Sequence, residues 1–220
     1  MPAPGEHHPA FEEYCECIFE LREDNVEVIQ ARVAERLNVS RPSVSEMIKR
    51  MESEGLITLQ GSKIVLTPTG EVLAERVVRR HRIAERFLTD ILGLSWAQAH
   101  HEAGKWEHIM SDDVEQAIDR LLGNPTTCPH GNPIPGSSYR DDNAVPLSTI
   151  QVGSAFTVTR IPEELEFTPG MLDFLEEFAV VPGSHGRVQS ANEAGACTVT
   201  IGDRDVEIDS FASARILVRA

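Results

Sequence analysis

Apolar residues recur at helical spacing through the first quarter of the chain. Phe11, Tyr14, Cys15, Ile18 and Leu21 share one face and predict a helix over 11–23. The same spacing predicts a second helix over 27–38. A third helix begins at Ser40 or Ser43, because either serine can cap it and proline suits its first turn. Ser43 and Glu46 also have the spacing of a capping box.

Two short strand-like runs follow the third helix. They cover 56–59 and 64–66, flank Gly61 and Ser62, and predict a β-hairpin. Three helices and a hairpin form the pattern of a winged helix-turn-helix. In this motif the second and third helices form the helix-turn-helix, and the third helix enters the DNA major groove. The alternative interpretation is a winged helix that is used only for contact with another protein.

The remaining sequence divides into a helical part, a proline-rich part and a part with strand patterns. A long helix is predicted over 71–92 and one or two more over 96–121, enough for a dimer interface. Prolines and glycines in 124–148 predict a linker. Strand-like runs near 156, 199 and 216, with a helix over 169–178, predict a small β-barrel-like domain. The fold class is therefore mainly α with a β C-terminal domain, divided into residues 1–74, 75–140 and 149–220.

Charge is distributed unevenly along the chain. The 220 residues carry 20 Lys and Arg against 35 Asp and Glu, a formal net charge of −15, which argues against a broad nucleic-acid-coating surface. The acidity lies at the two ends. Residues 28–50, by contrast, hold five Arg or Lys against only Glu35 and Glu46. This local surplus favours a compact DNA-reading unit on an acidic body.

Cysteine usage and hydropathy indicate the compartment. Cys15, Cys17, Cys128 and Cys197 form no CxxC pair, which is typical of a reduced protein rather than a disulfide scaffold. No run approaches the roughly 18 apolar residues that a membrane helix needs, and no secretory leader is visible. We therefore expect a cytoplasmic protein without a membrane partner.

Histidines and glutamates stand at spacings that place them on shared helix faces. His81 and Glu85 are four residues apart, and His100 shares a face with Glu107 and His108. Two further pairs are three residues apart: Glu13 with Glu16, and Glu163 with Glu166. Imidazole and carboxylate together suit a divalent metal, although each pair alone is typical of a solvated face. A metalloprotease HExxH motif is excluded because position 105, where its second histidine would stand, is Lys105.

Several blocks in order carry a family resemblance. They read ARVAERLNVSRPSVSEMIKRMESEGLI, LTPTG, RRHRIAERFL, HHEAGKWEHIMSDDVE and GNPIPG. Together they span most of residues 11–136, and the sequence resembles the diphtheria toxin repressor family of metal-dependent bacterial regulators. The last 70 residues match weakly, but their strand pattern is similar to the SH3-like third domain of long members.

The resemblance implies a homodimeric repressor that binds a palindromic operator when loaded with Fe²⁺ or Mn²⁺ at two positions per subunit. Carried over by motif, the first metal position uses His81, Glu85 and His100, with Glu163 and Glu166 from the third domain. The second uses Glu107, His108 and Glu13, with Glu16 beside them on the first helix. The expected DNA-binding residues lie on and near the reading helix: Arg32, Ser40, Arg41, Pro42, Ser43, Ser45, Glu46 and Arg50.

The departures from the family pattern bear on the metal. Iron-sensing members usually place Met where Glu13 stands and Cys where Gly104 stands, whereas manganese-sensing members carry carboxylates on the first helix. Loss of soft sulfur ligands favours oxygen-rich coordination, which Mn²⁺ accepts readily. The sequence therefore favours manganese over iron, with Gly104 leaving one coordination position open. Cys17 is the candidate sulfur ligand, and a buried structural role is the alternative for it.

Two rival interpretations remain on the sequence alone. One is a metalloenzyme with a helical carboxylate–histidine site. No nucleophile or substrate-pocket motif accompanies those ligands, and the winged helix would go unexplained. The other is a winged-helix regulator that senses something else and uses its His and Glu residues structurally.

Overall fold

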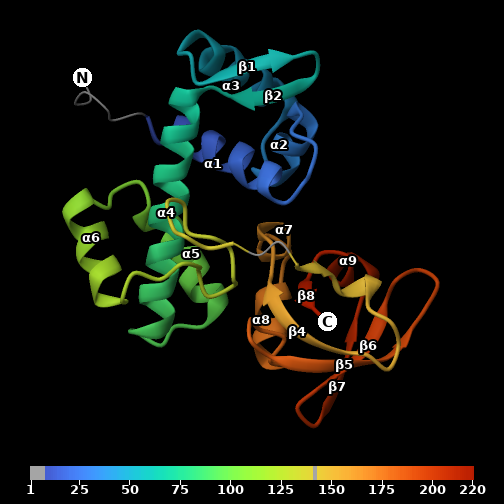
Figure 1. Ribbon diagram of the computed structural model, residues 1–220. Helices are drawn as coiled ribbons and strands as arrows, with labels where there is room; N and C mark the ends of the chain where they lie inside the picture. The colour runs from blue at the N-terminus through green and yellow to red at the C-terminus, as the bar shows by residue number, and fades with distance from the viewer. Residues whose placement is uncertain (1–7, 141–142) are drawn as a thin grey trace.

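The computed structural model describes residues 8–140 and 143–220, arranged as a helical N-terminal half and a β-rich C-terminal domain (Figure 1). The helices in the first half are α1 (Pro9–Glu23), α2 (Gln30–Arg36), α3 (Arg41–Ser53), α4 (Pro68–Asp90), α5 (Trp96–Trp106) and α6 (Asp112–Leu121). A hairpin of β1 (Ile57–Gln60) and β2 (Lys63–Leu66) lies between α3 and α4.

The first three helices and the hairpin enclose one hydrophobic core, as the winged-helix pattern predicts. Ile18 of α1, Val33 of α2 and Ile48 of α3 are each at most 1% exposed within it. Of the two serines that could cap α3, the structure uses Ser40, whose Oγ accepts a hydrogen bond from the Ser43 backbone N–H. The second helix is shorter than the predicted 27–38 because 27–29 is extended, with Ile29 bridging to Lys63 in the hairpin.

Helix α4 connects the N-terminal unit to the rest of the molecule. Its first half packs against α1, and its second half packs against α5 and α6, so the long helix runs through both regions (Figure 1). Ile83 and Leu88 bury their side chains against Ala99 and Ala103 of α5. The predicted region over 96–121 is two helices, separated at residues 107–111 and capped afresh by Ser111.

The C-terminal domain is a six-stranded antiparallel sheet in the order β3-β8-β4-β5-β6-β7. Its strands are β3 (Val145–Pro146), β4 (Ala155–Arg160), β5 (His185–Ala191), β6 (Cys197–Ile201), β7 (Arg204–Ile208) and β8 (Leu217–Arg219). Three short helices accompany them: α7 (Glu163–Glu166), α8 (Met171–Glu177) and α9 (Ser210–Ser213), with a 3-10 turn at Leu147–Thr149. The predicted fold class, mainly α with a β C-terminal domain, is confirmed.

The proline-rich segment is more than the linker that its composition predicts. Cys128, His130 and Asn132 are all buried, at 0–1% exposure. Asn132 donates its side-chain amide to the Ile161 carbonyl at 2.9 Å, and the Ile161 N–H donates to the His130 carbonyl at 2.8 Å. This segment therefore fastens the end of β4 and the start of α7 to the helical region.

Among the described residues, no helix is long and apolar enough to cross a membrane.

Candidate metal centre

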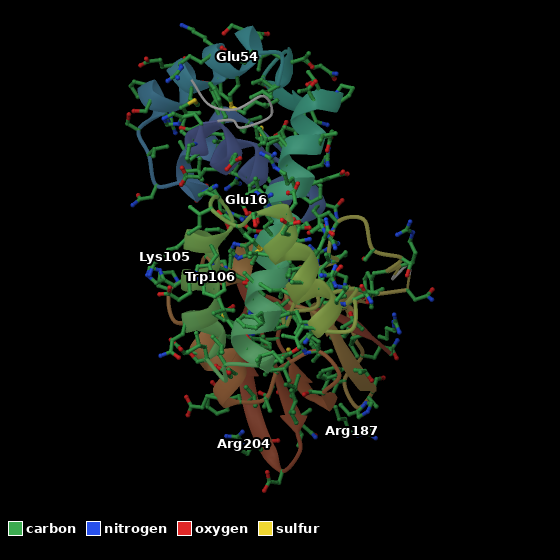
Figure 2. All side chains as sticks on the ribbon, turned by 90° about the vertical axis from the view of Figure 1, so that its left-hand side faces the viewer. Glu16, Glu54, Lys105, Trp106, Arg187 and Arg204 are labelled. Atoms are coloured by element: carbon green, nitrogen blue, oxygen red, sulfur yellow. The ribbon has the colours of Figure 1, made fainter. Side chains whose placement is uncertain are left out.

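Four helices and the 128–132 segment bring carboxylates and imidazoles together between the N-terminal unit and the C-terminal domain. Glu12, Glu13 and Glu16 come from α1, His81 and Glu85 from α4, His100 from α5, and Glu107 and His108 directly follow α5. Helix α7 follows the end of β4 at Pro162 and supplies Glu163 and Glu166. Figure 2 shows Glu16 at the junction between the N-terminal unit and the helices beneath it, with Lys105 and Trp106 at the end of α5.

The more buried group is here called the inner site, formed by His81, Glu85, His100, Cys128, His130, Glu163 and Glu166. His100 Nδ1 lies 3.0 Å from Glu85 Oε1 and 3.2 Å from Glu166 Oε2. His130 Nδ1 lies 2.9 Å from the same Glu166 oxygen and 3.5 Å from Glu85 Oε2. Five of these residues are thus brought together as the sequence predicts, and two are additions.

The additions, Cys128 and His130, were missed because the sequence around them predicts a linker. The Cys128 Sγ lies 3.8 Å from His130 Nδ1. The ligand atoms of Glu85, Cys128 and His130 lie close enough together to bind one metal ion. The Trp96 and His130 rings pack perpendicular to each other, with ring centroids 4.5 Å apart. The Cys-x-His spacing of these two residues is a weak metal motif that could have drawn notice.

Charges within the inner site alter its titration. Burial alone would raise the pKa of Glu166, but the neighbouring His130 and hydrogen bonds from His100 and His130 lower it to about 2. Burial and Glu166 together raise the pKa of Glu163 to about 7. Burial opposes the charged form of His100, yet its hydrogen bonds to Glu166 and Glu85 raise its pKa to about 10. In the metal-free protein, the proton on His100 therefore offsets the negative charge of the neighbouring Glu85 and Glu166 carboxylates.

The second group, here called the outer site, consists of Glu13, Glu16, Glu107 and His108 around a cavity of about 350 Å³. His108 Nε2 lies 3.2 Å from Glu107 Oε1. Glu107 Oε2 lies 2.5 Å from His81 Nδ1, and Glu16 Oε1 lies 4.0 Å from the same nitrogen. His81 therefore stands between the two sites, with Nε2 3.1 Å from Glu85 in the inner site.

The acidic residue of α1 that contacts His108 is not the one expected from the sequence. Glu13 is exposed on the lining of the cavity, while its neighbour Glu12 is buried and holds His108 Nδ1 at 2.8 Å. Arg76 of α4 also pairs with Glu12, at 2.9 Å. The sequence motif names Glu13 and overlooks Glu12, although Glu12 and Glu16 are four residues apart and share a helix face.

Several polar atoms in these sites are buried with no hydrogen-bond partner in the described part of the chain. They include Glu16 Oε1, Glu163 Oε2 and His130 Nε2. Burial and the adjacent Glu107 raise the pKa of Glu16 well above its usual value. Unpaired buried acceptors are costly, and a cation would satisfy them, so the residues present fit a divalent metal.

The residues expected to bind DNA gather on one exposed face. Ser40, Arg41, Pro42, Ser43, Glu46 and Arg50 are exposed at or along α3, whereas Ser45 is half-buried. Arg32 is exposed on α2 and pairs with Glu35 at 2.9 Å. Arg187 and Arg204 of the C-terminal sheet lie at the opposite end of the molecule (Figure 2).

Three family models match the chain in order. They describe the iron-dependent repressor N-terminal DNA-binding domain (residues 8–65), the iron-dependent repressor metal-binding and dimerisation domain (67–136) and the FeoA domain (145–220). The iron-dependent repressor IdeR of Mycobacterium tuberculosis (strain H37Rv) is 38% identical over 209 residues, which cover 90% of this chain and 91% of the relative. The chain belongs to the iron-dependent repressor family.

Other family members extend the comparison. The diphtheria toxin repressor of Corynebacterium diphtheriae is 37% identical over 212 residues, covering 91% of this chain and 93% of that protein. A solved structure described as a manganese-dependent transcriptional repressor in complex with manganese has a TM-score of 0.85 and 33% identity, covering 96% and 99% of the two chains. Family members are metal-dependent repressors, not enzymes, which removes the metalloenzyme interpretation.

Proposed function

We propose that this protein is a manganese-responsive repressor that binds a palindromic operator as a homodimer and controls metal-ion homeostasis. In this proposal residues 1–74 read DNA, 75–140 bind metal and dimerise, and 149–220 add ligands from the third domain. The observation that supports it best is the pair of His/Glu groups that share His81 and join α1 to α4 and α5. Iron is the alternative metal.

Each site offers a full set of donors for one divalent ion. At the inner position, His81, Glu85, His100, Glu163 and Glu166 are the expected ligands, and Cys128 and His130 reach the same Glu85 carboxylate. At the outer position, Glu13, Glu16, Glu107 and His108 surround the cavity. The inner site is therefore proposed with two more candidate ligands than the sequence alone indicates.

The donor chemistry of the outer position favours Mn²⁺ over Fe²⁺. Its four expected ligands are carboxylates and imidazole, which suit a hard to borderline cation. A Cβ added at Gly104 would meet open space, so no side chain fills that corner of the cavity. Cys17 also lines the cavity, but burial raises the pKa of its thiol, which disfavours the thiolate form that binds metal.

The chain's own residues explain how metal and DNA binding are linked. Burial and the neighbouring carboxylate of Glu163 raise the pKa of Glu20, and Glu16 is affected in the same way by Glu107. A divalent cation bound at the outer site would add positive charge beside these carboxylates. Helix α1 carries these acids on one face and packs Ile18 and Leu21 against α2 and α3 on another. Fixing α1 on α4 and α5 therefore fixes the orientation of the reading helix, by a coupling of about 1–3 kcal/mol.

The decisive test is operator binding against buffered Mn²⁺, Fe²⁺, Co²⁺ and Zn²⁺. We expect Mn²⁺ and Fe²⁺ to activate operator binding at free concentrations near those of the cell. Mn²⁺ should raise operator affinity more than Fe²⁺ does. Zn²⁺ and Co²⁺ can activate at lower concentrations because affinity rises along the transition series, so total-metal titrations would mislead. Operator binding that is the same with and without every metal would overturn the proposal.

Glu107→Ala tests the outer position directly. The variant removes a carboxylate that contacts both His81 and His108, so we expect metal-dependent operator binding to fall by about 100-fold or more, with dimers intact. The matched control is Glu102→Ala, five residues earlier on α5, because Glu102 is exposed and pairs with Lys105 on the surface. Gel shifts and sedimentation of both variants give the two readouts. Equal, unchanged operator binding by both would remove Glu107 from the site.

A further inference from the structure

Glu46 is an isolated acid at the centre of the exposed face of the reading helix. Pro42 and Ser43 lie one turn before it on α3, and Lys49 and Arg50 lie one turn after it. All five are exposed, while Val44 and Ile48 hold the helix to the core. In a recognition helix that enters the major groove, residues of the N-terminal part contact base edges, and Glu46 stands in the second turn of α3.

The carboxylate of Glu46 is not neutralised by its neighbours. Arg50 stands four residues on, the usual distance for a helical ion pair, but its guanidinium lies over the Phe11 ring, 5.3 Å from the ring centroid. Within residues 8–140 and 143–220, no cationic group lies within 4.0 Å of the Glu46 carboxylate. The acid is therefore free to contact a partner.

The other small polar groups of the reading helix are partly occupied. Ser40 Oγ accepts from the Ser43 N–H and lies 2.8 Å from Ser43 Oγ, so both hydroxyls take part in the helix cap. In the first two turns of α3, Arg41 and Glu46 are the long polar side chains that are exposed and available to contact DNA. A free carboxylate facing DNA repels phosphates and weakens binding to every sequence, unless it gains a hydrogen bond from a base.

The chemistry of the major groove limits which base can give that hydrogen bond. An ionised carboxylate only accepts, and the exposed donors are the N4 amino group of cytosine and the N6 amino group of adenine. Adenine also presents its N7 acceptor beside N6, which repels the second carboxylate oxygen. We infer that Glu46 selects a cytosine in each operator half-site by accepting a hydrogen bond from its N4 amino group. This inference rests on the proposed function.

The test is selection of binding sites from a randomised DNA library by the full-length, Mn²⁺-loaded protein. We expect the wild-type protein to enrich one cytosine at a fixed position in each half-site. In Glu46→Gln the amide can both donate and accept, and so can pair with adenine N7 and N6. That variant is therefore expected to lose about tenfold in discrimination for cytosine and to gain preference for adenine at the same position.

Glu52→Gln is the matched control. It removes the same charge from an exposed position on the same helix, but six residues on and hence on a different face. Its selected sequence should equal that of the wild-type protein. Titrations of single-base operator variants at one fixed salt concentration then give the fold-changes, and metal calorimetry verifies that both variants keep an intact sensor.

Each other outcome contradicts the inference. If Glu46→Gln keeps the wild-type base preference at every position, Glu46 does not read a base. If both variants simply bind all sequences more tightly, the carboxylate acts only by general repulsion. A wild-type protein that selects a site without the cytosine overturns the inference but leaves the proposed function standing. A metal-loaded protein that selects no sequence overturns both.

Discussion

His81 is the residue that belongs to both metal groups. Its Nε2 lies 3.1 Å from Glu85 and 3.2 Å from His100 Nδ1, while its Nδ1 faces Glu107 at 2.5 Å. One imidazole can ligate through one nitrogen and orient a carboxylate through the other. The two positions should therefore depend on one another through this ring.

Substitution of His81 tests whether this residue serves both metal sites, whereas most of the other candidate ligands serve only one. We expect His81→Ala to weaken both metal-binding events by at least about tenfold, because losing a side chain that only orients a metal ligand already costs about that much. His108→Ala should weaken only the event at the outer site. Calorimetric titration with Mn²⁺ distinguishes the two patterns, and a His81→Ala protein that loses one event alone would contradict the shared role.

Cys128 is the buried thiol closest to the inner ligands, and Cys128→Ser tests it with little change in volume. Burial and the nearby Glu85 raise the pKa of this thiol, so a metal ion that binds its sulfur must displace the thiol proton. With Co²⁺ as a probe, we expect a sulfur-to-metal charge-transfer absorption in the wild-type protein that disappears in Cys128→Ser. Cys17→Ser is the comparison, and loss of the band in that variant instead would assign the sulfur ligand to the outer site.

At the scale of elements, the 128–132 segment depends on one backbone conformation. Gly131 has φ +88°, and a Cβ there would lie 2.3 Å from the Thr159 carbonyl oxygen. Gly131→Ala should therefore displace His130 and Asn132, with a loss of several kcal/mol and of inner-site metal affinity. Gly136→Ala is the control, because φ is also positive there but its Cβ meets open space. Thermal unfolding and Mn²⁺ titration of both variants check the difference.

The elements themselves were largely predictable, because helical periodicity and turn residues are local. Four of the five predicted inner-site ligands stand on α4 and α7, where a spacing of three or four residues sets a shared face. The 128–132 segment has no such period, so Cys128 and His130 could not be placed. A shift of one residue turns a helix by about 100°, and this separates buried Glu12 from exposed Glu13.

At the scale of the whole molecule, an ion-pair network joins all three parts of the chain. Arg82 of α4 is fully buried and pairs with Glu23 at the end of α1 and with Glu163 of α7. Arg160 of β4 reaches Asp24 at 2.7 Å. Breaking one member of such a buried network leaves another charge uncompensated. These ion pairs link the position of the third domain to that of α1.

The charged groups between the parts also set the pH dependence of the metal-free protein. The folded-state pKa of His100 is about 10 and that of Glu163 about 7, both raised, so the folded chain binds these protons more tightly than the unfolded chain. The His100 contribution is complete below about pH 6.5 and is lost as pH rises toward 10. The Glu163 contribution is complete below about pH 4.5 and is lost as pH rises through 7. Glu166, with a pKa of about 2, loses its contribution only in acid.

We therefore expect the Tm of the metal-free protein to fall by about 5 °C or more between pH 5.5 and pH 8.5. Saturating Mn²⁺ should reverse the direction, because ligands must give up their protons to bind metal and binding stabilises the folded state. Scanning fluorimetry with a chelator and with excess Mn²⁺ across this range measures both slopes. Two parallel curves would mean that the inner-site protons and the metal do not compete for the same groups.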